Sequence, residues 1–311
     1  LAREIGTGAS ADASLSELVA DERIGAAMVQ HADHLLTAAP ARAAELYRGA
    51  IACGADAGSL AVRRAAAAWA SGEVDAAAEI VDTRTETSPD DPVAFADITA
   101  AVWAARGMMA QADAVYRVAP STDPITATHA MIAAYGVGSG AVVDIDATMT
   151  APSALGVAMS LLRRGLRESI DDRTDDAALA DLVRSAEMYT TAKAAGPICE
   201  LPAVIAAVAA LNLGGLSTAQ GVIDDALTHA HGGAWARPRL LLWRAWIAVQ
   251  RGHPTEAGEA LLRAHTLSST LTPRDALLAH AVRVAVARRY EDASGLEEVW
   301  RQARASILRT D

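Results

Sequence analysis

The order of apolar and polar positions along this chain has the period of amphipathic helices. In WRAWIAVQRGHPTEAGEALLRAH, residues 243–265, apolar side chains recur every three or four positions on both sides of a polar break. The break contains Gly252 and Pro254, which are typical of a helix end followed by a helix start. The stretch predicts two short helices joined by a tight turn.

This unit recurs along the chain. Gly252 follows Ala245 by seven positions and precedes Ala257 by five, and alanines stand at the same offsets around Gly72, Gly107 and Gly214. Less regular units are centred on Ala39, Gly138, Arg173 and Arg289. The clearest neighbouring turns lie 33 to 38 residues apart, close to the roughly 34-residue period of tetratricopeptide repeats.

The repeats predict an all-α fold. Small residues are expected where the two helices of a hairpin press together, glycine at the turn, and proline after the second helix to end it, as at Pro89 and Pro124. We expect a tetratricopeptide-like, right-handed superhelix of about eight degenerate helix-turn-helix repeats. It forms one unit over residues 1–311, with a possible irregular break at 136–152, where glycines interrupt the period.

Composition and charge argue against a membrane protein and against a nucleic-acid-binding protein. No run of 18 apolar residues and no amino-terminal signal pattern occurs, so we expect no membrane span. Cys53 and Cys199 have no nearby partner in the sequence and suit buried positions in a cytoplasmic protein. A net charge of -11, with Lys193 as the only lysine, argues against direct contact with nucleic acid or an anionic membrane.

Catalytic and metal-binding motifs are weak. The segment GVGSG at 136–140 follows no predicted strand, and neither GxxxxGK[ST] nor GxSxG occurs. The pairs His31 with His34 and His229 with His231 do not have zinc-site spacing and are interpreted as solvated helix ends. We therefore expect a binding protein, without enzyme activity, metal or cofactor in this segment.

The repeat frame predicts which side chains face the inside of the superhelix. A groove with aromatic rings, carboxylates and guanidinium groups can stack on a sugar and bond its hydroxyls, and it also suits a peptide. We favour the surroundings of Arg239 and Trp246. The candidates on the concave face are Trp69, Asp97, Tyr135, Arg163, Arg167, Asp171, Asn212, Arg239, Trp246, Gln250 and Arg283.

The last third of the chain carries a family resemblance. The segments PRLLLWRAWIAVQRGHPTEAGEALLRAH, TPRDALLAHAVRVAVARRYED and GLEEVWRQARASILR resemble the helical-repeat part of large actinobacterial LuxR-type regulators, in the MalT-like class of signal-transducing NTPases. The similarity is carried by the phrases around Arg239, Gly252, Arg274, Asp275, His280 and Trp300. The first 230 residues are similar only as repeats, and the NTPase and helix-turn-helix motifs of the class are absent.

The resemblance implies a sensor arm cut from a larger regulator. In that class the superhelix binds an inducer, often a small carbohydrate, and occupancy releases the NTPase and DNA-binding domains. The expected function is therefore binding of a disaccharide or short oligosaccharide in the concave groove, coupled to those missing domains. The alternative is a scaffold that holds a peptide or a partner regulator; a closed pocket favours the first and a long open groove favours the second.

Overall fold

Helices are the only regular secondary structure in the described part of the chain. The computed structural model describes residues 22–83, 92–139, 153–170, 176–267 and 271–308, and these contain fifteen α-helices and no strand, which confirms the all-α class. The helices are α2 (Glu22–Leu35), α3 (Pro40–Ala52), α4 (Ala61–Ser71), α5 (Val74–Thr83), α6 (Pro92–Ala105), α7 (Met109–Val118), α8 (Pro124–Gly136), α9 (Ala154–Ile170), α10 (Asp176–Thr191), α11 (Pro202–Asn212), α12 (Leu216–Thr228), α13 (Ala236–Arg251), α14 (Pro254–Leu267), α15 (Pro273–Tyr290) and α16 (Ala293–Ile307).

Successive helices pack as hairpins, with one irregularity in the middle. The pairs are α2 with α3, α4 with α5, α6 with α7, α9 with α10, α11 with α12, α13 with α14 and α15 with α16. Helix α8 stands between the third and fourth pairs and contacts both α7 and α9. The described residues thus form seven hairpins and a single helix, and both the expected count of eight and the right-handed superhelix stay predictions.

The turn glycines adopt the conformation that the repeat pattern requires. The φ angles of Gly72, Gly107, Gly214 and Gly252 are 92°, 84°, 77° and 83°. They lie in the left-handed region, which is unfavourable for residues other than glycine. Their partner alanines are buried to 1% exposure or less, namely Ala65, Ala77, Ala100, Ala112, Ala207, Ala219, Ala245 and Ala257. The predicted glycine turns and small-residue crossings are confirmed for these four hairpins.

Other boundary predictions are corrected or lie outside the described residues. Arg289 belongs to helix α15, and the turn follows two residues later because Asp292 caps the next helix. Pro124 begins helix α8 rather than ending α7, since the Asp123 carboxylate accepts hydrogen bonds from the backbone N–H groups at the start of α8. Gly138 follows α8 with φ 69°. Most of the break predicted at 136–152, the predicted turn at Arg173 and Pro89 lie outside the described residues.

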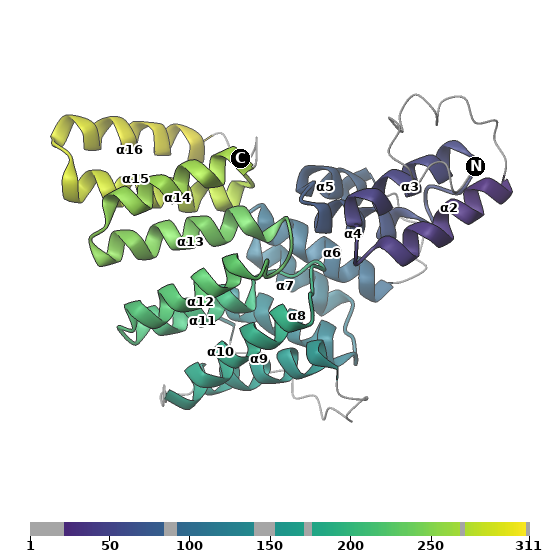
Figure 1. Cartoon of the computed structure of the whole chain (residues 1–311), viewed down its shortest axis with the longest axis horizontal. Helices are drawn as coiled ribbons and strands as arrows, with labels where there is room; N and C mark the ends of the chain where they lie inside the picture. Colours follow the sequence, from purple (N-terminus) through teal and green to yellow (C-terminus); the bar gives the residue numbers. More distant parts are fainter. Residues whose placement is uncertain (1–21, 84–91, 140–152, 171–175, 268–270, 309–311) are drawn as a thin grey trace.

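The hairpins follow an arc that brings distant helices together. Helices α2–α5 and α13–α16 occupy opposite upper sides of the molecule, with α8–α12 below them (Figure 1). Helices α6 and α15 contact each other across the arc. The Trp69 ring of α4 lies 4.8 Å from the Trp235 ring, centre to centre, so segments more than 160 residues apart in sequence share a core.

The connection between α10 and α11 runs through the interior of this arc. Lys193 is exposed at its start and has φ 50°. Farther along, Ile198, Cys199, Glu200 and Leu201 are at most 9% exposed. We call residues 192–201 the inner loop. It occupies the space in which the repeat pattern predicts an open groove.

Cys53 and Cys199 are both buried free thiols, as predicted. No described helix combines the length and the apolar character needed to cross a membrane.

Candidate functional site: a buried ion-pair network and an adjoining cleft

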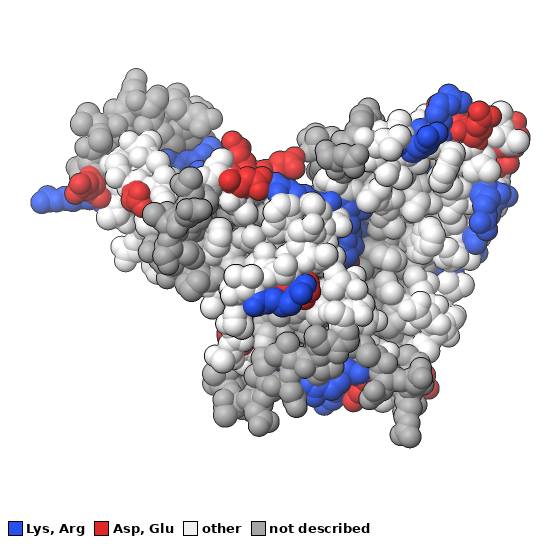
Figure 2. Space-filling view, turned by 180° about the vertical axis from the view of Figure 1, so that it is seen from behind, with Lys and Arg blue, Asp and Glu red and all other residues white. Residues whose placement is uncertain are grey.

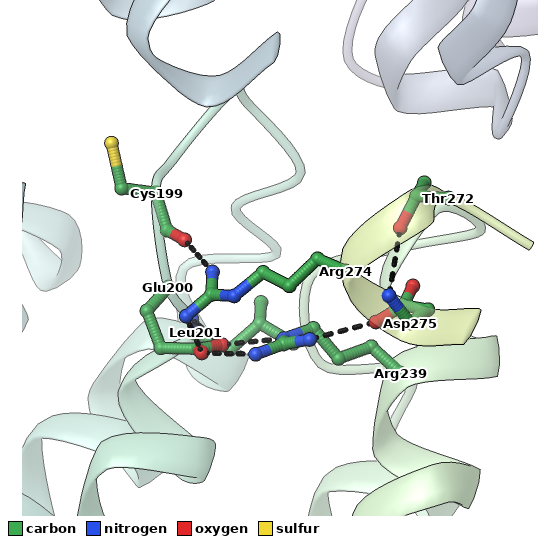
Figure 3. A network of polar contacts seen from close by, with 7 residues as sticks. All are labelled: Cys199, Glu200, Leu201, Arg239, Thr272, Arg274 and Asp275. Atoms are coloured by element: carbon green, nitrogen blue, oxygen red, sulfur yellow. Dashed lines mark hydrogen bonds and ion pairs between the residues drawn. The ribbon is translucent and has the colours of Figure 1, made fainter. Parts of the chain in front are cut away.

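Arg239 lies at the centre of a buried polar network (Figure 3). It points from the first turns of α13 toward the inner loop, and only 6% of the residue is exposed. Its Nε donates to Glu200 Oε1 at 2.8 Å, Nη2 donates to Glu200 Oε2, and Nη1 donates to Asp275 Oδ1 at 2.7 Å. The guanidinium is therefore paired with carboxylates from the inner loop and from α15.

A second guanidinium from α15 completes the network. Arg274 Nη2 donates to Glu200 Oε2 at 2.9 Å, and Nη1 donates to the carbonyl oxygen of Cys199 at 2.8 Å. The backbone N–H of Leu201 donates to Glu200 Oε1 at 3.0 Å, and that of Asp275 donates to Thr272 Oγ1 at 3.2 Å, which caps α15. Figure 3 shows both arginines converging on Glu200. We call Glu200, Arg239, Arg274 and Asp275 the central network.

Opposite charges balance burial in this network. Burial acts to raise the pKa of the Glu200 carboxyl, but Arg239 and Arg274 outweigh burial and hold this pKa below its ordinary value. Burial likewise acts to lower the pKa of Arg239, and Glu200 and Asp275 raise it instead. For Arg274, burial dominates and lowers the pKa despite the attraction of Glu200. Arg239 thus forms ion pairs with two carboxylates, whereas Arg274 forms one with Glu200.

A related set of polar contacts joins α6, α7 and α8. Asp97 accepts hydrogen bonds from Tyr116 Oη at 3.0 Å and from Thr126 Oγ1 at 3.2 Å, and its carboxylate lies 3.2 Å from His129 Nδ1.

Burial raises the pKa of the Cys199 thiol to about 12. The thiol is therefore protonated at neutral pH and is a poor nucleophile.

An open cleft adjoins the central network. It has a volume of about 530 Å³, within the ~300–1,000 Å³ range typical of ligand pockets. It lies between the α4–α5 turn, the start of α13 and the start of α15, and we call it the interarm cleft. Its charged, hydroxyl and aromatic lining residues are Ser71, Glu73, Asp75, Trp235, Arg237, Thr272 and Asp275.

The interarm cleft has the chemistry of a site for a neutral polyhydroxyl compound. Carboxylates accept hydrogen bonds from hydroxyl groups, Arg237 donates, and the Trp235 ring offers an apolar face. The buried Trp235 Nε1 has no hydrogen-bond acceptor among the described residues. On the face in Figure 2, carboxylates and basic side chains lie next to each other in the notch between the two arms. The cleft lining itself contains the carboxylates of Glu73, Asp75 and Asp275 and the guanidinium of Arg237, and this excess of carboxylates disfavours an anionic ligand.

The cavity beside Arg239 itself is much smaller. Its volume is about 30 Å³, and its walls include Trp69, Trp235 and Cys199. This space is comparable to that of one water molecule and cannot hold a sugar. Trp69 is only 1% exposed. The expectation that Trp69 and Arg239 face an open groove is therefore wrong, because the inner loop and the opposite arm cover them.

The other predicted residues are spread over several environments. Tyr135 is 40% exposed at the end of α8 and lines an apolar pocket described below. Asn212 is exposed at the last residue of α11. Arg163 and Arg167 are partly buried on α9, and Arg163 Nη1 has no acceptor among the described residues. Asp171 lies outside the described residues.

The C-terminal candidates are held by neighbouring helices. Trp246 packs partly buried against the core of α13, α14 and α15. Gln250 Oε1 accepts a hydrogen bond from Arg289 Nη2 at 3.4 Å, and Arg283 Nη2 lies 3.0 Å from His265 Nε2. The structure therefore does not gather the predicted residues into one pocket, and Asp97 is engaged between helices.

Apart from Arg239, the central network and the polar lining of the cleft consist of residues that the repeat frame did not select. Glu200 lies in a connection rather than in a repeat helix, Trp235 lies immediately before α13, and Arg237 lies in its first turn. Arg274 and Asp275 were marked only by the family resemblance. The available signal is Glu200 itself, a charged residue inside the apolar run ICELP; such a residue requires a partner if it is buried.

Of the two histidine pairs, His31, His34 and His229 are exposed, and only His231 differs from the sequence interpretation. His231 is 1% exposed, so it is a core residue and not a solvated helix end. Within the described ranges, no three His, Cys, Asp or Glu side chains come together as metal ligands.

Comparison with protein-family models, with curated proteins and with solved structures finds no match for this chain.

Proposed function

We propose that this chain is a ligand-sensing α-solenoid that binds a small neutral carbohydrate, a disaccharide or short oligosaccharide, in the interarm cleft. The observation that carries the proposal is the cleft itself: about 530 Å³, with carboxylates, hydroxyls, a guanidinium and an indole in its walls. The inner loop fills part of the interior, and this favours a compact ligand over a long extended peptide.

The position of the cleft suggests how occupancy is communicated. Its walls come from α4 and α5 on one side and from α13 to α15 on the other, so a ligand that contacts both sides favours the closed arrangement of the two arms. A ligand shifts an equilibrium only by binding one conformation better than another. In a larger LuxR-type, MalT-like regulator, this preference would act on NTPase and helix-turn-helix domains outside this segment.

The test is a thermal-shift screen against mono-, di- and trisaccharides. A ligand at 100 times its dissociation constant stabilises the folded state by about 2.7 kcal/mol, which corresponds to several degrees for a chain of this size. We expect one neutral sugar to raise the melting temperature and its phosphorylated derivative to have a smaller effect.

Matched variants locate the site. Glu73→Gln alters a carboxylate of the cleft, whereas Glu259→Gln makes the same change on an exposed position of α14. We expect only the first to weaken the sugar response. A flat response to the whole panel, or equal effects of both variants, would remove the support for sugar binding in this cleft.

A second candidate function, protein binding, is favoured by α16. Trp300, Ile307 and Leu308, in and just after this helix, are 58%, 48% and 62% exposed, and clustered exposed apolar side chains are typical of interaction surfaces. Sedimentation over a range of concentrations, with Trp300→Ser beside the original chain, tests whether this surface joins two copies. Self-association that the variant abolishes, together with no sugar response, would favour the scaffold.

A further inference from the structure

A second pocket lies apart from the interarm cleft, between α8, α9, α11 and α13. Its volume is about 200 Å³. Most of its wall is apolar and includes Ile132, Leu166, Leu182, Val204, Val208 and the Trp243 ring. Tyr135, which is 40% exposed, also lines it. We call it the α8–α13 pocket.

The polar groups of this pocket include two hydrogen-bond donors with unused capacity. The buried Trp243 Nε1 has no acceptor among the described residues. Arg274 also lines the pocket; its bonds to Cys199 and Glu200 engage one N–H of each Nη atom, and a guanidinium carries five N–H groups. The wall therefore offers donors to an oxygen acceptor on a ligand.

The charged residues of the pocket wall are Arg274 and Glu200. Both Glu200 oxygens accept hydrogen bonds from Arg239, and Oε2 also accepts one from Arg274. Burial lowers the pKa of Arg274, and an anionic group placed on its free N–H groups would favour the charged form of this guanidinium.

The volume limits the size of the apolar part. A dry cavity of about 150 Å³ binds benzene, so 200 Å³ accommodates a single ring with one small substituent. The apolar wall offers few groups for the many hydroxyls of a sugar. The ligand class for this pocket therefore differs from that of the interarm cleft.

We propose that the α8–α13 pocket binds a small monocyclic carboxylic acid. Its ring lies among the apolar side chains of α8, α9 and α11, and its carboxylate accepts hydrogen bonds from Arg274 and Trp243. The proposal is independent of sugar binding.

Isothermal titration of the whole chain with benzoate and with cyclohexanecarboxylate tests this assignment. We expect saturable binding of one molecule per chain, and weaker binding of the neutral analogues benzyl alcohol and toluene. Trp243→Phe keeps the ring but removes the N–H, and the loss of a hydrogen bond to a charged group should weaken benzoate binding about tenfold or more. Ala209→Leu places extra volume in the pocket and should abolish binding.

Two controls make the same substitutions on exposed positions of α16. Trp300→Phe and Ala305→Leu should leave the dissociation constant for benzoate unchanged, and circular dichroism checks that every variant is folded. The proposal is overturned if neither acid binds, or if benzoate binds Ala209→Leu as tightly as the original chain. Equal affinity for toluene and benzoate, unaffected by Trp243→Phe, would overturn the assignment of the carboxylate to these two donors.

Discussion

At the scale of single residues, the central network makes folding depend on charge pairing inside a core. Arg239, Glu200 and Asp275 are each less than 10% exposed. A buried ion pair adds little to the free energy of unfolding compared with apolar residues that replace all of its members. Removing only one partner, however, leaves the other charge buried and uncompensated. The stability effect of these residues therefore appears mainly when one of them is changed alone.

Replacing Arg239 by methionine should lower the free energy of unfolding by about 3–5 kcal/mol, because two buried carboxylates lose their cation. Arg244 of the same helix forms an ion pair with Asp224 at 3.1 Å, with both side chains more than a third exposed, so Arg244→Met should cost less than about 1 kcal/mol. Urea unfolding of both variants measures the difference. Equal losses would contradict a special role for the central network.

His231 provides a separate dependence of stability on pH. Its Nε2 accepts a hydrogen bond from the Ala203 N–H at 3.4 Å, which leaves the proton on Nδ1, 2.7 Å from Thr190 Oγ1. Burial lowers its pKa to about 4 from the ordinary value of 6.5. Between these values the unfolded chain binds the proton and the folded chain does not.

The free energy of unfolding should therefore fall as the pH is lowered from 6.5 toward 4, with a contribution of about 3 kcal/mol from His231. Denaturant unfolding at a series of pH values measures this slope. His231→Gln should flatten the curve in that window, whereas His253→Gln, at a half-exposed turn position, should not. A wild-type slope that persists in His231→Gln would assign the effect to other groups.

At the scale of elements, the turn chemistry was readable from the sequence. Gly72, Gly107, Gly214 and Gly252 could be placed because only a glycine fits a left-handed turn at low cost, and the surrounding alanines repeat at fixed offsets. The turn after α15 was placed two residues early, since no glycine marks it and Asp292 supplies a cap instead. Local signals thus located the hairpins to within a few residues.

Gly232 is a close-approach glycine that no repeat pattern indicates. A Cβ there would lie 2.6 Å from Ala236 Cβ and 2.7 Å from Leu201 Cδ2, and its φ is 75°. Gly232→Ala should therefore destabilise the chain by about 2–4 kcal/mol through overlap and backbone strain. Gly221→Ala, in α12 with open space around it, should instead stabilise by about 0.5–1 kcal/mol.

Thermal unfolding of the two alanine variants compares these effects directly. Opposite shifts of the melting temperature are expected. A neutral Gly232→Ala would show that the inner loop yields to the added methyl group, and would remove the argument for tight packing between residues 232 and 201.

The inner loop is the element that sequence reasoning could not place. The repeat frame assigns side chains to a concave face by their position in a helix, and it says nothing about a connection that folds into that face. Ile198, Cys199 and Glu200 are buried. Ile198 and Cys199 belong to a core cluster that includes residues of α6, and Cys199 and Glu200 accept hydrogen bonds from α13 and α15, all of which are distant in sequence. Arg239 was predicted to face an open groove, but Glu200 and Asp275 engage its guanidinium and only 6% of the residue is exposed.

At the scale of the whole molecule, contacts between the ends of the arc make the solenoid less one-dimensional than its repeats suggest. In a simple solenoid each repeat contacts only its neighbours. Here Trp69 packs on Trp235, and α6 contacts α15. The interarm cleft exists only while these contacts hold the arms in place.

Trp69→Ala should therefore have two effects. Loss of a buried indole costs about 3–5 kcal/mol, and loss of the packing on Trp235 should let the arms separate. Small-angle X-ray scattering should show a larger radius of gyration, while Trp300→Ala on exposed α16 should leave both the stability and the radius nearly unchanged. A destabilised variant with an unchanged radius would mean that α6 and α15 suffice to hold the arc closed.

Lys193 gives this molecule a natural attachment point for a fluorescent dye. It is the only lysine in the sequence, and it is exposed at the start of the same loop that carries Glu200. Once the amino group at the start of the chain has been chemically blocked, an amine-reactive dye would label this one side chain. Its emission would report on the surroundings of the inner loop during a titration, with no engineered residue in the chain.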